Sequence, residues 1–338
     1  MSFMPNLPIG KLPPDLLSRL LGSILPRDPA VLLGPGVGRD CAVIDAGGHQ
    51  LLIAKTDPIT FATDEIGWYA VHVNANDVAT TGAEPRWFMA TLLLPASIDA
   101  AGIQAIFDDM RQACGEIGVS IVGGHTEVTA DLARPIVIGT LLGLVARERL
   151  IVPAGAQPGD ALIMTKRLAV EATSLIAREK AAELSGTFAT EFLTRCRAFL
   201  HAPGISVVRD AQLACGAGRV HAMHDPTEGG LATALNELAI AADAVLEIDP
   251  AQVPIYAETQ RLCDHYGLDA WGVIASGSLL IAAAADDAAS IVRALRSAGV
   301  EAEIIGRVGE KTARPQVVSK TGDRLKSFDQ DEITRLFQ

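Results

Sequence analysis

The stretch IGWYAVHVNANDVATTGAEP, from Ile66 to Pro85, predicts a helix that is apolar on nearly every face. Apolar residues recur along it at steps of three and four positions, namely at Ile66, Tyr69, Ala70, Val73 and Val78. Gly82 and Pro85 then supply the usual signals for the end of a helix. Because the remaining faces of this helix are also apolar, we expect it to be buried inside the fold.

The same helix carries polar residues in one stripe, since Asn74, Asp77 and Thr81 are spaced at i, i+3 and i+7. An ionised carboxylate in a dry interior costs several kcal/mol unless a cation or a set of donors compensates it. Asp77 therefore needs a partner, and a metal ion is the simplest candidate. The alternative is that Asp77 caps a neighbouring loop or pairs with an arginine.

The length of 338 residues favours two domains of about 150 residues each. The boundary is expected in the segment RERLIVPAGAQPGD, at 147–160, where charges, prolines and glycines separate two apolar runs. We therefore predict an N-terminal domain over residues 1–150 and a C-terminal domain over residues 151–338. A hydrophobic fraction of 49% with 20% charged residues is typical of well-packed globular domains.

Charge and composition exclude several classes of protein. A net charge of −12 and a pI near 5.0 argue against a nucleic-acid partner, because phosphates are neutralised by basic surfaces. The start MSFMPNLPIGKLPP lacks the pattern of a signal peptide, and no apolar run approaches the roughly 18 residues of a membrane span. Five cysteines without a C-x-x-C pair fit reduced thiols. We therefore expect a cytoplasmic protein without a membrane partner or a structural zinc ion.

The apolar patterns predict an α+β fold made of two α/β-type domains. In the first domain the predicted order is β-β-α-β-α-β-β, with strands at Cys41–Ile44, Gln50–Thr56, Trp87–Leu94, a strand from Ser120, and Ile136–Val145. In the second domain, strand patterns at Ala161–Thr165, Arg219–His224, Val245–Ile248, Gly277–Ala283 and Glu303–Val308 alternate with helical ones. The first sheet is expected to be antiparallel or mixed.

Acidic or glycine-rich turns recur at the predicted strand ends. They are GVGRD with Asp40, KTD with Asp57, GGHTE with His125 and Glu127, and DPTEGG with Asp225 and Glu228. Glycines let the backbone approach phosphates, and hard carboxylate oxygens suit Mg²⁺ that bridges a nucleotide. Each of these segments alone is explained by ordinary turn chemistry. Together with a buried Asp77, they favour a Mg²⁺–nucleotide site. Neither Gly34-x-Gly36-x-Gly38 nor GRVGEKT at 306–312 fits the common phosphate-binding fingerprints.

In this order and spacing, GVGRDCAVI, AKTD, VNANDVATTGAEP, IVGGHTEV and DPTEGGLATALNELA resemble the aminoimidazole ribonucleotide (AIR) synthase, or PurM-like, superfamily. The chain is most similar to its HypE branch, the hydrogenase maturation proteins. The resemblance implies a homodimer in which the N-terminal sheets pair into a β-barrel, and a C-terminal mixed sheet with helices. It also implies that ATP binds at the dimer interface with Mg²⁺, and that its γ-phosphate passes to a carbonyl, amide or phosphate oxygen of a small molecule or acyl group.

The resemblance assigns roles to residues by their motif positions. The implied metal ligands are Asp40, Asp57 and Asp77. The implied nucleotide-binding residues are Asn74, Gly123, Gly124, His125, Thr126 and Glu127. The implied catalytic residues on the substrate side are Asp225, Thr227 and Glu228.

Three departures separate this chain from the family pattern. Arg39 stands where the family has an acid, and His125 stands where many members have an aspartate, so His125 is not assigned as a metal ligand. HypE ends in a cysteine that carries a carbamoyl group, whereas the last cysteine here is Cys263 in a predicted helix. Two alternatives therefore stay open, an enzyme similar to thiamine monophosphate kinase and a non-catalytic nucleotide-binding maturation partner.

Overall fold

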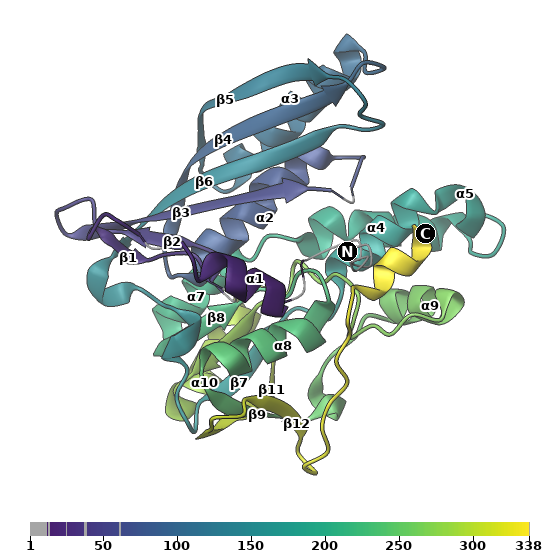
Figure 1. Cartoon of the computed structure of the whole chain (residues 1–338). Coiled ribbons are helices and arrows are strands. Elements are labelled where there is room, and N and C mark those ends of the chain that lie inside the picture. Colours follow the sequence, from purple (N-terminus) through teal and green to yellow (C-terminus); the bar gives the residue numbers. More distant parts are fainter. Residues whose placement is uncertain (1–11, 13, 25, 37–38, 61, 338) are drawn as a thin grey trace, which may run out of the picture.

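The computed structural model describes residues 12, 14–24, 26–36, 39–60 and 62–337, which form two six-stranded mixed sheets with helices (Figure 1). The predicted fold class of two α/β-type domains is confirmed. The chain passes from the first sheet to the second between Ala146 and Ala161, through two short 3₁₀ turns. The start of the chain and Val37–Gly38 of the GVGRD turn lie outside the described residues.

The N-terminal sheet has the strand order β1-β2-β3-β6-β4-β5, and its pairs are antiparallel except for parallel β4 and β5. Its strands are β1 (Val31–Leu33), β2 (Ala42–Ile44), β3 (Gln50–Ile59), β4 (Glu84–Pro95), β5 (Ser120–Thr129) and β6 (Ile136–Ala146). The helices of this half are α1 (Pro14–Leu21), α2 (Ile66–Thr80) and α3 (Ala100–Glu116).

Helix α2 lies between the two halves of the molecule. It contacts β3, β6 and α3 on one side, and α7 (Val208–Ala217) and β8 (Val220–His224) of the C-terminal half on the other. Of its 15 residues, 14 are buried. The prediction that this helix is buried inside the fold is therefore confirmed, and its burial explains why nearly every face is apolar. The position of α2 also brings Asn76 and Asp77 to the junction of the two halves, where Asn76 bonds to the backbone of Ile205 and Val207.

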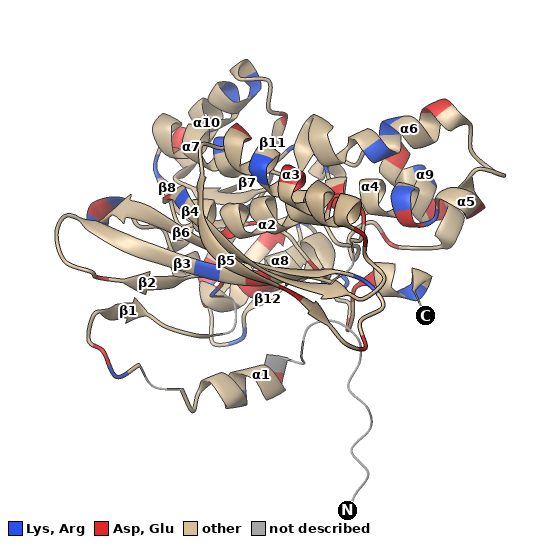
Figure 2. Cartoon of the chain, turned by 90° about the horizontal axis from the view of Figure 1, so that it is seen from above, with Lys and Arg blue, Asp and Glu red and all other residues tan. Residues whose placement is uncertain are grey.

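The face of the N-terminal sheet that turns away from α2 and α3 is apolar and partly open. Residues of β6 alternate between buried and partly exposed, and the partly exposed series includes Ile136, Ile138, Leu142 and Leu144. At the edge of the sheet, Ile121, Val122 and Val128 of β5 are exposed by 45%, 53% and 62%. The strands of this sheet are drawn mostly tan in Figure 2, so few of their residues are charged. An open sheet face with exposed apolar residues on its edge strand is a surface on which another chain can pack.

The C-terminal sheet has the order β12-β9-β11-β7-β10-β8, with parallel β12 and β9 and otherwise antiparallel pairs. Its other strands are β7 (Ala161–Thr165), β9 (Ala244–Ile248), β10 (Leu280–Ala283), β11 (Ala302–Lys311) and β12 (Gln316–Ser319). The further helices are α4 (Val170–Glu179), α5 (Ala181–Leu184), α6 (Thr190–Ala198), α8 (Gly230–Ala241), α9 (Ala257–Tyr266) and α10 (Ala285–Ser297). In the described part of the chain, no helix is long and apolar enough to cross a membrane.

Two sequence predictions about the turns are wrong. Strand β3 does not end at Thr56 but continues to Ile59, which is paired with Val137. The GGHTE segment is not a turn, because it lies inside β5 and pairs with β4. As predicted for the DPTEGG segment, Pro226 lies in a loop, and helix α8 begins after it at Gly230. In β3 and β5 a proline or a pair of glycines suggested a turn, whereas the paired strand continues through these residues.

Candidate functional site

The partner of Asp77 inside the fold is a lysine. The Nζ atom of Lys55 on β3 lies 2.8 Å from Asp77 Oδ2 and 3.1 Å from Asp57 Oδ2. The side chains of Lys55 and Asp77 are only 9% and 4% exposed, so water screens this pair little. Burial alone would lower the pKa of Lys55, but the negative charges of Asp77 and Asp57 outweigh it and raise the pKa. Lys55 is therefore a fixed positive charge.

The alternation of β3 explains why a lysine points inward. Leu51 and Ile53 are buried on the face of β3 that packs against α2. Lys55 and Asp57 follow at steps of two residues and so lie on that same face. The strand therefore directs its one ammonium group toward α2, where Asp77 meets it.

Two more aspartates belong to the same cluster. Asp225 follows β8 and is 1% exposed, and Asp40 precedes β2. Burial, followed by the charges of Asp77 and Asp40, raises the pKa of Asp225 well above its ordinary value. Burial also raises the pKa of Asp77 to about 6, against the opposing effect of Lys55. The structure thus brings Asp40, Asp57, Asp77 and Asp225 together around Lys55.

His224 also reaches this cluster, and no motif in the sequence predicts it there. Its buried imidazole lies between Asp40, at 3.9 Å from Nδ1 to Oδ2, and Glu237, at 2.9 Å from Nε2 to Oε2. His221 points elsewhere and pairs with Asp160 at 2.9 Å. Each of these two histidines therefore lies beside a carboxylate.

Asn74 fixes the backbone of β3 next to the cluster. Its Oδ1 accepts the N–H of Asp57 at 2.9 Å, and its Nδ2 donates to the carbonyls of Asp57 and Ala70 at 3.3 and 2.8 Å. A Cβ atom at Gly139 of β6 would lie 2.3 Å from Asn74 Nδ2, so this contact needs a glycine there. The amide of Asn74 thus holds the backbone of Asp57 in place and also bonds to its own helix at Ala70.

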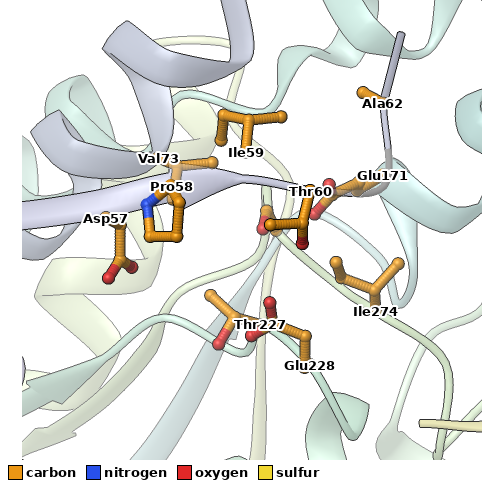
Figure 3. Close-up of a pocket in the computed structure, with 11 residues that line it drawn as sticks. Asp57, Pro58, Ile59, Thr60, Ala62, Val73, Glu171, Thr227, Glu228 and Ile274 are labelled. Carbon is orange, nitrogen blue, oxygen red and sulfur yellow. The ribbon is translucent and has the colours of Figure 1, made fainter. Parts of the chain in front are cut away.

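The loop from Asp225 to Gly229 forms the opposite wall of the site. Gly229 and Gly230 adopt positive φ angles of 80° and 63°, which allow the sharp turn into α8. The Gly229 N–H donates to Asp331 Oδ2 at 2.7 Å and ties the loop down. Thr227 and Glu228 thereby face Asp57 across a pocket between the two halves of the chain (Figure 3).

The GGHTE segment lies away from this pocket within one chain. Strands β6 and β4 separate β5 from β3, which amounts to roughly 14 Å at ordinary strand spacing. His125 pairs with Thr91 and Glu127 with Leu93 of β4, residues that alternate with buried Leu92. Both side chains therefore point to the open face of the sheet, where they lie 3.1 Å apart. A Cβ atom at Gly124 would lie 2.2 Å from the Ala90 carbonyl, so this position requires glycine.

The aspartate cluster suits a hard divalent cation. Both carboxylate oxygens of Asp225 lack a hydrogen-bond donor, and Lys55 is shared among several negative groups. In the described residues, no three acidic, histidine or cysteine side chains are arranged to hold one ion together. Mg²⁺ commonly needs only one or two carboxylates and takes its other ligands from phosphates and water. The donor set therefore fits Mg²⁺ that arrives with a nucleotide.

The N-terminal domain of the AIR synthase related proteins matches residues 38–145, and their C-terminal domain matches residues 157–317. The chain belongs to this AIR synthase related family and lies near its HypE branch. Carbamoyl dehydratase HypE of Cupriavidus necator is 32% identical over 81% of this chain and 77% of that protein. Selenide, water dikinase of Pelobacter propionicus is 28% identical over 90% of this chain and 93% of its own.

Solved structures show the same fold. The hydrogenase maturation protein HypE in complex with ATP superposes with a TM-score of 0.70 at 25% identity, over 93% of this chain and 95% of that one. The predicted PurM-like fold of two domains is therefore confirmed, and the chain is related to enzymes of which one has been solved with ATP.

Proposed function

We propose that this protein is an ATP- and Mg²⁺-dependent enzyme of the cytoplasm. It transfers the γ-phosphate of ATP to a carbonyl, amide or phosphate oxygen of a small molecule or acyl group. The observation that carries this proposal is the buried cluster of Asp40, Asp57, Asp77 and Asp225 around Lys55, which opens toward the pocket at Thr227 and Glu228. In this arrangement residues 1–150 bind the nucleotide and residues 151–338 bind the acceptor.

Some residues of the site would compensate charge, and others would orient the acceptor. Asp40, Asp57 and Asp77 would offer carboxylate oxygens, one or two of them as direct ligands, to Mg²⁺ that arrives with ATP, and this ion would offset the negative charge of the triphosphate. Lys55 keeps the carboxylates ionised in a buried place. Across the pocket, Thr227 and Glu228 orient the acceptor, whose oxygen bonds to the γ-phosphorus while the bond to the β–γ bridging oxygen breaks.

We further propose that the working form is a homodimer joined through the N-terminal sheets. In one chain the aspartate cluster faces α2, whereas His125 and Glu127 face the open side of the sheet. One nucleotide can contact both groups most simply if a second chain supplies its β5. We therefore assign Gly123, Gly124, Thr126 and their neighbours His125 and Glu127 to the nucleotide across that interface. Asn74 acts on the nucleotide through the position of Asp57.

The dimer predicts a specific effect of Leu142→Glu on the open face of β6. A carboxylate in an apolar sheet-to-sheet contact has no partner there, so we expect the mass of one chain, 35.4 kDa, instead of twice this mass. We also expect the affinity for Mg-ATP to fall by about tenfold or more. Light scattering and calorimetry measure both quantities. Ile240→Glu, at a 55% exposed position on α8, is the control and should change neither. A wild-type protein that is monomeric at micromolar concentration contradicts the proposal.

A second prediction concerns the cysteines. Cys263 is 1% exposed on α9, and burial raises the pKa of its thiol to about 12, so it is a poor nucleophile. Cys41, Cys114 and Cys196 are buried as well, and burial also raises the pKa of the partly exposed Cys215. We therefore expect no cyanide adduct on any cysteine after incubation with ATP, carbamoyl phosphate and a HypF protein, the kind of partner seen in a HypE–HypF complex. Intact-mass spectrometry decides this, and a stable thiocyanate would show that a cysteine here does take part.

The release of ADP tests the proposed function itself. Mg²⁺-dependent turnover that increases when a metabolite extract is added supports an enzyme with a free acceptor. Binding of Mg-ATP without any turnover supports instead the non-catalytic partner. Turnover stimulated by thiamine monophosphate alone supports the kinase-like alternative.

A further inference from the structure

The pocket between β3 and the loop after β8 has an unusual chemical lining. Its polar side chains are the carboxylates Asp57, Glu171 and Glu228 and the hydroxyls Thr60, Thr227 and Ser276. None of the described residues that line it is Lys, Arg or His. An anionic group that entered this pocket would therefore meet three acidic side chains without a cation among the lining residues.

Glu171 is the lining residue with an unsatisfied group. It is the second residue of α4 and is 5% exposed, and its Oε2 atom has no hydrogen-bond partner. Figure 3 shows its carboxyl turned toward Thr60 and the centre of the pocket. The backbone of Glu171 is fixed by Ser276, because the Glu171 N–H donates to the Ser276 carbonyl at 3.2 Å. A buried oxygen without a hydrogen bond lowers the stability of the folded protein unless a ligand binds to it.

The electrostatics of Glu171 indicate which ligand would relieve this cost. Burial, and then the charges of Glu228 and Asp331, raise the pKa of Glu171 to about 8, against hydrogen bonds from Ser276. A cation with N–H donors would offset both the burial and the neighbouring negative charges. A neutral or negative ligand would not compensate the neighbouring negative charges.

The size of the pocket limits the ligand further. The cavity has a volume of about 40 Å³. Pockets for whole ligands usually measure about 300–1,000 Å³, and one water takes about 30 Å³ of liquid volume. The cavity therefore accommodates one small head group, and the rest of a substrate must lie outside it.

We propose that this pocket binds a small cationic nitrogen group of the phosphoryl acceptor, a primary ammonium or an amidinium, with Glu171 as its direct contact. This assignment rests on the proposed function, because it names the class of acceptor for the same site. Asp57 belongs to both the pocket and the aspartate cluster, so the nitrogen group is held beside the place where the γ-phosphate is expected. Glu171 thereby selects for the charge of the acceptor.

Three isosteric probes test the sign of the charge without ATP. Acetamidinium, acetamide and acetate have nearly the same shape but charges of about +1, 0 and −1. Ligand-observed NMR on the full chain should show the tightest binding for acetamidinium and the weakest for acetate. In Glu171→Gln, acetamidinium should bind about tenfold more weakly, because a charge-assisted hydrogen bond is lost. Glu179→Gln, on the same helix but outside the pocket lining, should bind like the wild type.

Three results would overturn the assignment. They are acetate binding as tightly as acetamidinium, unchanged acetamidinium binding in both Glu171→Gln and Glu228→Gln, and displacement of acetamidinium by Mg²⁺ alone at equal concentration. The last would make the pocket a metal site. Binding of Mg-ATP is measured in parallel on the same samples. Acetamidinium binding without Mg-ATP binding contradicts the proposed function alone, and the reverse contradicts only the assignment of the pocket.

Discussion

Replacing Lys55 by methionine is expected to lower the free energy of unfolding by about 3–5 kcal/mol at pH 8, because it leaves buried carboxylates without their cation. Lys55 Nζ lies within 3.1 Å of both Asp57 and Asp77, and its side chain is 9% exposed. Methionine has a similar length, so the loss reports the charge rather than a cavity. Urea denaturation of the variant and the wild type measures it.

The same variant should show a distinct dependence on pH. The pKa of Asp77 is about 6 in the folded protein and 3.8 in its ordinary state, so the folded form binds more protons and stability falls as pH rises through this window. Without Lys55 the pKa of Asp77 moves higher still, so the folded form loses more stability when Asp77 ionises. The loss in free energy of unfolding that Lys55→Met causes should therefore be small at pH 5 and large at pH 8.

Two further variants separate charge from packing. Adding Asp77→Asn to Lys55→Met removes one of the stranded carboxylates, so the double variant should be more stable than Lys55→Met at pH 8. Lys326→Met removes an exposed lysine that also lies 2.7 Å from its aspartate, and it should change stability little. An equal deficit at pH 5 and pH 8 would mean that Lys55 contributes through packing and not through charge.

The helix α2 was predictable because its signals are local. A three- to four-residue apolar period and the Gly82 stop set its limits, and the absence of a polar face indicated burial on all sides. The need of Asp77 for a cation was also visible in the sequence. The identity of that cation was not, because it depends on how β3 packs against α2. The inward direction of Lys55 can still be derived from the alternation of Leu51, Ile53 and Lys55.

Elements that depend on distant pairing were harder to predict. Strands β1 and β12 have 3 and 4 residues, too few to show a period, and they exist because a neighbouring strand pairs with them. Gly123 and Gly124 suggested a turn, whereas the structure uses Gly124 to let β5 approach the Ala90 carbonyl. Glu171 carried no sequence signal, because an acid in the first turn of a helix is common. Its significance comes from burial by segments far away in the chain.

The candidate site therefore combines two kinds of residue. Asp40, Asp57, Asp77, Asp225, Thr227 and Glu228 were singled out from their motifs, and the structure places them around one junction, while their individual roles stay predictions. Lys55, His224 and Glu171 were found only in the fold. The first group belongs to the motifs that resemble those of the family. Glu171 bears instead on which phosphoryl acceptor this chain binds.

Asp225→Asn is expected to raise stability while it lowers ATP turnover by about 100-fold or more, because a group kept for catalysis is often unfavourable for folding. Burial and the charges of Asp77 and Asp40 hold the pKa of Asp225 well above 3.8, so Asp225 lowers the stability of the wild type as pH rises above that value, and the amide variant lacks this contribution. The gain should therefore grow with pH and reach about 1–3 kcal/mol at pH 8. Thermal unfolding at pH 5 and pH 8, with ADP release at saturating Mg-ATP, measures both effects. Asp249→Asn, at a surface aspartate bound to Lys320, is the control and should leave turnover unchanged. If Asp225→Asn instead loses stability and keeps its turnover, Asp225 supports the fold and the aspartate cluster needs another explanation.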